Sequence, residues 1–298
     1  MAAELVRQLV DAGVHFGHRV SRWNPKMAPY IFGKRNAIHI IDIRESVKGL
    51  LRAKKFLSQI VGQGQDVLFV GTKRQARLLL HDHSIRCGMP YVIERWLGGT
   101  LTNFRTIRSR LARLEELEAA EADGTALEYS KKMIASRGRE QKKIKRNLEG
   151  IRTMTRLPGA VVVIDVQREH NAVKEAKKLK IPTVCLIDTD SDPDFADVPI
   201  PGNDDAMRSI ETVLTHLADA VIEGAKARTA PQPVEEGEQG GARRRTRRPT
   251  AGRTDDDSAV RSGMPVGDIA GGNETVMVGG STGAAASSGR PAAGTEVG

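Results

Sequence analysis

The strongest constraint on the fold is a set of short, almost unbroken apolar runs that alternate with amphipathic segments. The runs are AIHIIDI (37–43), DVLFVG (66–71), PYVI (90–93), GAVVVID (159–165) and IPTVCLID (181–188). Strands that are apolar on both faces are typical of a parallel sheet with helices on each side. The helical segments between them lie near residues 45–61, 73–87, 169–179 and 204–224. This alternation predicts an α/β fold with a Rossmann-like, doubly wound parallel sheet.

A helical insertion interrupts the alternation between the runs at 90–93 and 159–165. The apolar residues of its two helical segments recur at helical spacing: Ile107, Leu111, Leu114 and Leu117 in the first, and Ile144, Leu148 and Ile151 in the second. Narrow apolar seams of this kind are typical of antiparallel helices in a coiled coil. We therefore expect residues 105–155 to form an α-helical coiled-coil hairpin that projects from the sheet.

The composition changes after residue 228. Beyond this point the chain contains no Leu and no aromatic residue, and Gly, Ala, Ser, Thr, Pro and Arg dominate. Such a segment buries too little apolar area to offset the entropy lost on ordering. The sequence thus predicts a discontinuous sheet domain at 1–104 and 156–228, the hairpin at 105–155, and a disordered C-terminal tail at 229–298.

The charge balance favours a polyanionic partner. The chain carries a net charge of +9, from 46 Lys and Arg against 37 Asp and Glu. Residues 229–298 contain 8 Arg and 9 Asp or Glu, so the basic excess belongs to the residues that precede them. A strongly basic fold indicates nucleic acid as the first candidate ligand. Within the tail, the run RRRTRR (243–248) fits either a weak RNA-binding arm or a solvated linker.

Cysteine usage and hydropathy exclude several classes of protein. Cys87 and Cys185 each lie in an apolar stretch, and neither has CxxC or Cys/His spacing. We therefore expect reduced core thiols, with no disulfide framework and no zinc ribbon. No apolar run approaches the ~18 residues of a membrane span, and the N-terminal residues lack the pattern of a secretion signal. These features predict a cytoplasmic protein that is neither secreted nor inserted in a membrane.

Basic residues cluster within the expected hairpin. Residues 105–155 carry 13 Lys and Arg against 8 Asp and Glu. The clusters are Arg105, Arg108, Arg110 and Arg113 in the first segment, and Lys142, Lys143, Lys145 and Arg146 in the second. Two interpretations stay open: these side chains contact phosphates, or they form solvated helix faces balanced by pairs one turn apart.

Two aromatic-containing stretches carry further basic candidates. In RWLGGTLTNF (95–104), the glycine pair permits a tight turn beneath which Trp96 can pack as a core aromatic, and Thr102 or Asn103 can cap the next helix. Around Trp23, basic side chains line a loop in which phosphate binding is expected. The complete set of RNA-binding candidates is Arg19, Arg22, Lys26, Lys73, Arg74, Arg95, Arg105, Arg108, Lys142 and Lys143.

The signatures of several enzyme and calcium sites are incomplete. The turn FVGTK (69–73) could present helix N-terminal amides to a phosphate, but it lacks the residue order of a P-loop, and no GxGxxG follows a predicted strand. The run DTDSDPD (188–194) resembles a calcium loop, yet prolines replace the required Gly and Glu, so it fits a turn better. We expect no enzyme activity. The alternative is a phosphate- or nucleotide-handling α/β enzyme that uses residues 71–73 with Asp188 and Asp204.

A divalent metal site is a further hypothesis. Asp188 follows a predicted strand, and Asp204 and Asp205 begin a helix, so these acids can meet in the crevice where doubly wound sheets bind ligands. His15 and His18 lie in a Gly-flanked loop that could reach the same crevice, and imidazole with carboxylate is a workable structural zinc set. Capping and hydrogen bonding explain each of these residues separately, so the alternative is that the chain has no cofactor.

Seven motifs together resemble one known family. They are GVHFGH (13–18), RWNPKM (22–27), FVGTK (69–73), RWLGGTLTNF (95–104), LEGIRTM (148–154), DTDSDPD (188–194) and PGNDDA (201–206). In this order they closely resemble the bacterial small-subunit ribosomal protein S-two family, over roughly residues 1 to 225. The resemblance implies a structural, rRNA-binding protein of the small ribosomal subunit that supports translation, with a Rossmann-like domain and a coiled-coil hairpin. It also implies a position beside the large ribosomal protein that captures messenger RNA. The tail departs from the usual family pattern.

Overall fold

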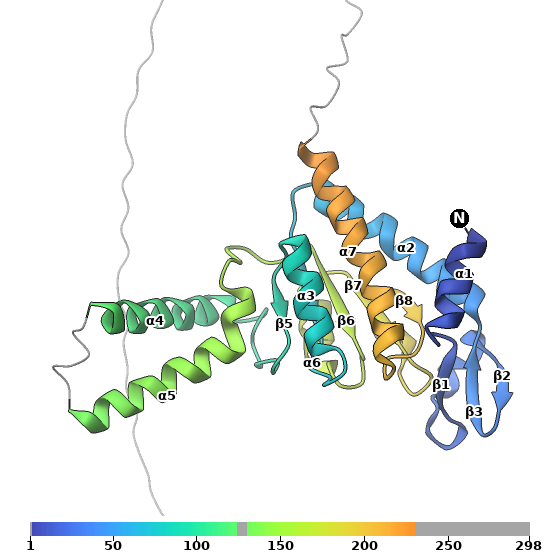
Figure 1. Cartoon of the computed structure of the whole chain (residues 1–298), viewed down its shortest axis with the longest axis horizontal. Helices are drawn as coiled ribbons and strands as arrows, with labels where there is room; N and C mark the ends of the chain where they lie inside the picture. Colours follow the sequence, from blue (N-terminus) through green and yellow to red (C-terminus); the bar gives the residue numbers. More distant parts are fainter. Residues whose placement is uncertain (1, 124–129, 230–298) are drawn as a thin grey trace, which may run out of the picture. The chain divides into compact units, whose positions relative to one another are not determined.

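The computed structural model describes residues 2–123 and 130–229, and Figure 1 shows their arrangement. The predicted tail lies outside the described residues, apart from Thr229 at the end of the last helix.

Five parallel strands form the central sheet, in the order β5-β4-β6-β7-β8. The predicted runs at 66–71, 90–93, 159–165 and 181–188 each supply one strand, which confirms the parallel α/β fold. The edge strand β8 escapes prediction because its sequence, VPIP, contains prolines that cannot donate ladder hydrogen bonds. The strands are β4 (Val67–Val70), β5 (Tyr91–Val92), β6 (Ala160–Ile164), β7 (Thr183–Ile187) and β8 (Val198–Pro201).

Each face of the sheet has its own core, which explains the unbroken apolar runs. In β6, Val162 and Ile164 join one core, whereas Val161 and Val163 join the other. Helices α2, α3 and α7 cover the first face, with α1 at its margin, and α6 covers the second. The helices are α1 (Ala2–Asp11), α2 (Ile43–Gly62), α3 (Arg77–Cys87), α6 (His170–Lys178) and α7 (Met207–Thr229).

The predicted strand at 37–43 does not belong to the parallel sheet, so this part of the prediction is wrong. Its residues form β3 (Ile38–Ile41), the centre of an antiparallel sheet with β1 (Phe16–Arg19) and β2 (Ile31–Arg35). β2 and β3 are joined by a tight turn in which Asn36 and Ala37 have φ of 51° and 60°. Such turns usually carry glycine. The hairpin signal is therefore weak in this sequence.

The insertion consists of two helices that pack against the sheet at one end. They are α4 (Phe104–Ala122) and α5 (Lys131–Leu148), followed by a short 3-10 turn at Glu149–Ile151. Ile107 and Leu111 of α4 and Leu148 of α5 belong to the core that also contains Val92 of β5. Figure 1 shows both helices extending away from the β5 edge of the sheet. We refer to residues 104–151 as the arm.

The two helices bury their apolar residues unequally. The predicted positions Ile107, Leu111, Leu114 and Leu117 are all buried in α4. Within α5, Leu148 is the one buried residue, and Ile144 is partly buried. The apolar seam is therefore more continuous on α4 than on α5.

Candidate nucleic-acid interface and acidic crevice

A single carboxylate holds the loop that leads into the arm. Glu175 on α6 accepts hydrogen bonds from the backbone N–H groups of Gly99 (2.8 Å), Leu101 (3.0 Å) and Thr102 (3.1 Å). It also accepts one from the indole Nε1 of Trp96 at 3.1 Å. Burial disfavours ionisation of Glu175, but these donors outweigh it and lower the pKa of the carboxyl. The loop from which α4 begins is thus fixed to α6.

The geometry of this joint follows the sequence prediction in part. Gly99 adopts φ +88°, a conformation that favours glycine. Trp96 is 8% exposed, so it packs as a core aromatic. Asn103 occupies the N-cap position of α4, but its side chain makes no cap hydrogen bond. Glu175 was not among the candidates, because one Glu on a helix gives no local signal of partners more than 70 residues away.

The cations at the base of the arm include several with no acidic partner. Arg105, Lys142 and Lys143 are exposed, and no carboxylate of the described residues makes an ion pair with them. Arg108 differs because its Nη1 donates to the backbone oxygen of Met154 at 3.1 Å, which ties the arm to the following loop. Several neighbours in the predicted basic clusters are paired: Arg113 with Glu116, Lys145 with Glu118 and Arg146 with Glu94.

The arm base also contains a shallow cavity of about 320 Å³. Arg110 and Lys143 line it from opposite helices together with the acidic Glu140, and Leu97, Ile144 and Leu148 provide apolar walls. A groove with cations on two rims can accept a phosphate backbone between them.

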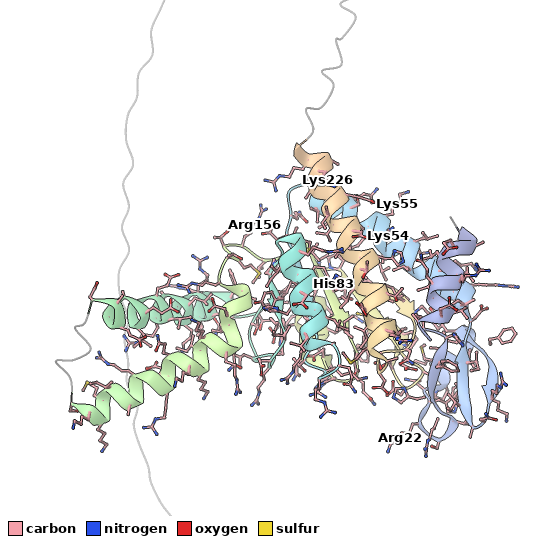
Figure 2. All side chains as sticks on the ribbon, viewed as in Figure 1. Arg22, Lys54, Lys55, His83, Arg156 and Lys226 are labelled. Atoms are coloured by element: carbon pink, nitrogen blue, oxygen red, sulfur yellow. The ribbon has the colours of Figure 1, made fainter. Side chains whose placement is uncertain are left out.

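Of the remaining basic candidates, four are exposed, and two are engaged by carboxylates and are described below. Arg74 and Arg95 are exposed, and no described carboxylate pairs with either. Arg19 and Arg22 are exposed in the same way, and Figure 2 shows Arg22 at the margin of the β1–β3–β2 sheet.

Lys26 is engaged by the run that resembled a calcium loop. Its Nζ lies 2.8 Å from Asp192 Oδ2 and 2.6 Å from Asp194 Oδ2. Asp192 also caps a short 3-10 turn by accepting from the N–H of Asp194 at 3.0 Å. The run is therefore a turn, as the sequence favoured, and Lys26 has a structural partner.

Lys73 is not displayed to solvent, which contradicts its place among the RNA-binding candidates. Its side chain is 11% exposed, and its Nζ lies 2.7 Å from Asp204, 2.6 Å from Asp205 and 3.4 Å from Asp165. Burial alone would lower the pKa of Lys73, but the three carboxylates outweigh it and raise the pKa. The ammonium is engaged by these carboxylates and is not presented to a phosphate in solution.

The acids around Lys73 come from the carboxyl ends of neighbouring strands. Lys73 follows β4, Asp165 follows β6, Asp188 follows β7, and Asp204 lies shortly after β8. This is the crevice in which doubly wound sheets bind ligands. Asp165 adopts φ +68°, which is uncommon outside glycine. The sequence prediction that Asp188, Asp204 and Asp205 converge here is consistent with these positions.

His18 reaches this crevice from β1. Its Nδ1 lies 3.0 Å from Asp188 Oδ2, and its Nε2 lies 3.2 Å from Asp205 Oδ2. The Asp188 carboxylate raises the pKa of His18 to about 9. Gly17 permits this approach, because a Cβ at that position would lie 2.6 Å from Thr189 Cγ2.

The donor set of the crevice fits a divalent metal. One ligand atom from each of His18, Asp188 and Asp204 lies within 4.8 Å of the others. Burial, with repulsion from Asp165 and Asp188, raises the pKa of Asp204. Lys73 offsets part of this repulsion, and a divalent cation would offset it further. One imidazole with carboxylates suits zinc.

His15 does not join this group, so its inclusion among the metal candidates is wrong. Its ring lies against Phe16, with centroids 4.2 Å apart, and it lines a pocket with Phe32 and Ile40. Burial lowers the pKa of His15. The HxxH spacing does not bring both side chains to the crevice, because residues three positions apart in an extended segment project from opposite faces.

The turn at residues 71–73 is closed to a nucleotide. The backbone N–H of Thr72 donates to the buried carboxylate of Glu169 at 2.8 Å, and the Thr72 hydroxyl donates to the same group. Arg168 donates from Nε to that hydroxyl oxygen at 3.0 Å. A phosphate would have to displace Glu169 and then face the acids around Lys73. This geometry argues against the alternative of a phosphate-handling enzyme.

Comparison with known proteins agrees with the motif pattern. A family model described as "Ribosomal protein S2" matches residues 9–224. The chain belongs to the ribosomal protein S2 family. Proteins of this family are structural components of ribosomes and not enzymes. Among the described residues, no helix combines the length and the apolar character needed to cross a membrane.

Individual relatives are similar over most of their length. The chain is 64% identical over 224 residues to the small ribosomal subunit protein uS2 of Rhodopirellula baltica, covering 75% of this chain and 86% of the relative. It is 51% identical over 226 residues to uS2 of Syntrophobacter fumaroxidans, covering 76% and 82%. It is 49% identical over 230 residues to uS2c of Cyanophora paradoxa, covering 77% and 99%.

Proposed function

We propose that this chain is a structural constituent of the small ribosomal subunit that binds rRNA through the cations at the base of the arm. The supporting observation is that Arg105, Lys142 and Lys143 are exposed and have no acidic partner within the described residues. Arg110 and Lys143 line a groove in which they outnumber its one acid, Glu140, and can contact a phosphate backbone. Contacts of this kind position a protein by RNA shape and charge and not by base sequence.

Other exposed cations lie outside the arm. The secondary candidates are exposed and have no acidic partner in the described part of the chain. They are Arg74, Arg95, Arg19 and Arg22. Arg108 ties the arm to the backbone of Met154, so its loss would also disturb the arm. We assign structural roles to Lys26 and Lys73, because carboxylates engage both.

The finer organisation is also part of the proposal. We propose that residues 105–155 form a coiled-coil hairpin inserted into a sheet domain at 1–104 and 156–228. The protein would be cytoplasmic and bound to the ribosome, beside other small-subunit proteins, which include the large protein that captures messenger RNA. Relatives named as small ribosomal subunit proteins support this location.

The test is binding of purified small-subunit rRNA to a variant with Arg105→Gln, Lys142→Gln and Lys143→Gln. We expect the affinity to fall by about two orders of magnitude at moderate salt, because several phosphate contacts are lost together. The matched control removes three exposed cations of α2, with Arg44→Gln, Arg52→Gln and Lys55→Gln, and should change affinity much less. Equal losses in both variants would mean that net charge, and not the arm, determines binding.

We also propose a structural divalent metal, of the zinc class, held by His18, Asp188 and Asp204. These residues supply one nitrogen and two oxygen ligands, and a bound cation would reduce the repulsion among the acids of the crevice. Metal analysis after dialysis against zinc should find about one ion per chain in the unaltered protein. It should find none in a variant with His18→Ala and Asp188→Ala, whereas His15→Ala should bind normally. Absence of zinc from the unaltered protein would refute the site.

A further inference from the structure

The β1–β3–β2 sheet carries an aromatic pair that the arm-based function does not use. Trp23 is 38% exposed and lies against His39, with ring centroids 5.1 Å apart and the planes tilted by 39°. His39 is only 7% exposed, and neither of its ring nitrogens has a hydrogen-bond partner. Burying an imidazole without partners is unfavourable compared with an apolar side chain of similar size. Trp23 is thus held from one side by a polar ring, and its own ring remains partly open to solvent.

The charged residues next to this pair on the sheet are cations. Lys34 pairs with His39 in the strand register, so both project from the same face. Arg22 directly precedes Trp23, whereas Arg19 and Arg35 both pair with Ile38 and so project from the opposite face of the sheet. All four cations are exposed, and no described carboxylate makes an ion pair with any of them.

Acids do approach from the neighbouring loop, but they are already engaged. The backbone N–H of Asn24 donates to Thr189 O at 2.8 Å, which brings the residues after Trp23 close to that loop. Asp192 and Asp194 of the loop pair with Lys26. Asp190 lies 3.9 Å from His18. Arg22 and Lys34 are therefore the unpaired charges beside the Trp23–His39 pair.

We propose that Trp23 and His39, with Arg22 and Lys34, form a binding site for unpaired nucleotides of single-stranded RNA. An open aromatic ring offers a stacking surface to a nucleobase, and cations at the strand ends neutralise the adjacent phosphates. A base in a duplex cannot stack on a protein side chain in this way, so the site selects single strands. The inference shares the RNA ligand class with the proposed function but uses a different surface from the arm.

The experiment measures binding of a short single-stranded oligouridylate and of a duplex RNA of the same length. We expect the single strand to bind more tightly and to quench tryptophan fluorescence, and we expect Trp23→Phe to remove the quenching while retaining most of the affinity. Trp23→Leu should lower the affinity about tenfold, as expected for the loss of one base–aromatic stack. Arg22→Gln with Lys34→Gln should lower it further and weaken its salt dependence.

The controls separate this site from the arm and from net charge. Arg52→Gln with Lys55→Gln on α2 should leave oligouridylate binding unchanged; Figure 2 labels Lys55 near the top of the view and Arg22 near the bottom. The triple arm variant should also bind oligouridylate normally, even if it no longer binds rRNA. A preference for duplex, or equal losses in Trp23→Phe and Trp23→Leu, would overturn the inference. An arm variant that binds rRNA normally would contradict the proposed function alone.

Discussion

The crevice at the end of the sheet and the base of the arm both gather charged residues, but they differ in the sign and pairing of those charges. In the crevice, Lys73 and His18 each lie within 3.5 Å of at least two carboxylates. At the arm base, Arg105, Lys142 and Lys143 have no carboxylate partner among the described residues. A buried pair acts on the stability of its own fold, whereas exposed charges of one sign attract a polyanion. Whether a cation serves the fold or a ligand depends on its partners in space.

Replacing Lys73 should have the largest effect on stability. We expect Lys73→Met to lower the free energy of unfolding by about 3–5 kcal/mol, because it leaves buried carboxylates without their cation. Chemical denaturation measures this loss, and rRNA affinity of the folded fraction should be unchanged. Adding Asp204→Asn should recover part of the stability, since it removes the most buried acid beside Lys73. A stable Lys73→Met variant that fails to bind rRNA would reverse the distinction between the two regions.

Replacing Glu175 should have an intermediate effect that spreads from the fold to the arm. We expect Glu175→Gln to cost about 1–3 kcal/mol, because the amide cannot satisfy all of its donors. Hydrogen exchange should become faster at the amides of Gly99, Leu101 and Thr102. Unchanged exchange there would show that the carboxylate does not hold the joint.

The same variant makes a prediction about pH. The folded pKa of Glu175 is lower than its ordinary value of 4.5, so its contribution to stability is complete above that pH. The contribution is lost as the pH falls through the lowered folded value. The stability difference between the unaltered protein and Glu175→Gln should therefore shrink in acid, as measured by denaturation at a series of pH values. A difference that grows in acid would contradict this assignment.

The smallest effect on stability is expected at the arm. We expect the triple arm variant to change the free energy of unfolding by less than about 0.5 kcal/mol per residue, since the three side chains are exposed. Its substitutions are Arg105→Gln, Lys142→Gln and Lys143→Gln. Thermal unfolding of the variant would check this. A large loss of stability would mean that the three side chains hold the arm together, and any loss of RNA binding would need that explanation.

The sequence predicts the parallel sheet well because each strand is buried on both faces and lacks polar interruptions. It fails at β3, where an apolar run of similar appearance lies in an antiparallel sheet. The difference depends on the turn at Asn36 and Ala37, whose left-handed conformations carry no glycine signal. It fails again at β8, because prolines hide an edge strand.

For the sites, composition predicts the kind of ligand better than it predicts the residues. The basic excess and the hairpin clusters indicate a polyanion, and the strand-end acids do meet in the crevice. Lys73 and Lys26 follow the same basic pattern, yet carboxylates from distant segments engage them. No sequence pattern indicates the roles of Glu175 and His39, since these roles depend on packing partners that are distant in the sequence or lie on a neighbouring segment. Such pairings are visible only in three dimensions.

Salt dependence of rRNA binding tests the central claim most directly. The logarithm of affinity should fall linearly with the logarithm of salt concentration, with a slope of roughly 0.7 to 0.9 per phosphate contacted. Each arm cation that contacts a phosphate contributes to that slope. Arg105→Gln, Lys142→Gln and Lys143→Gln should therefore reduce it by about two to three, whereas the α2 control variant should keep it. An unchanged slope in the arm variant would contradict phosphate binding by the arm.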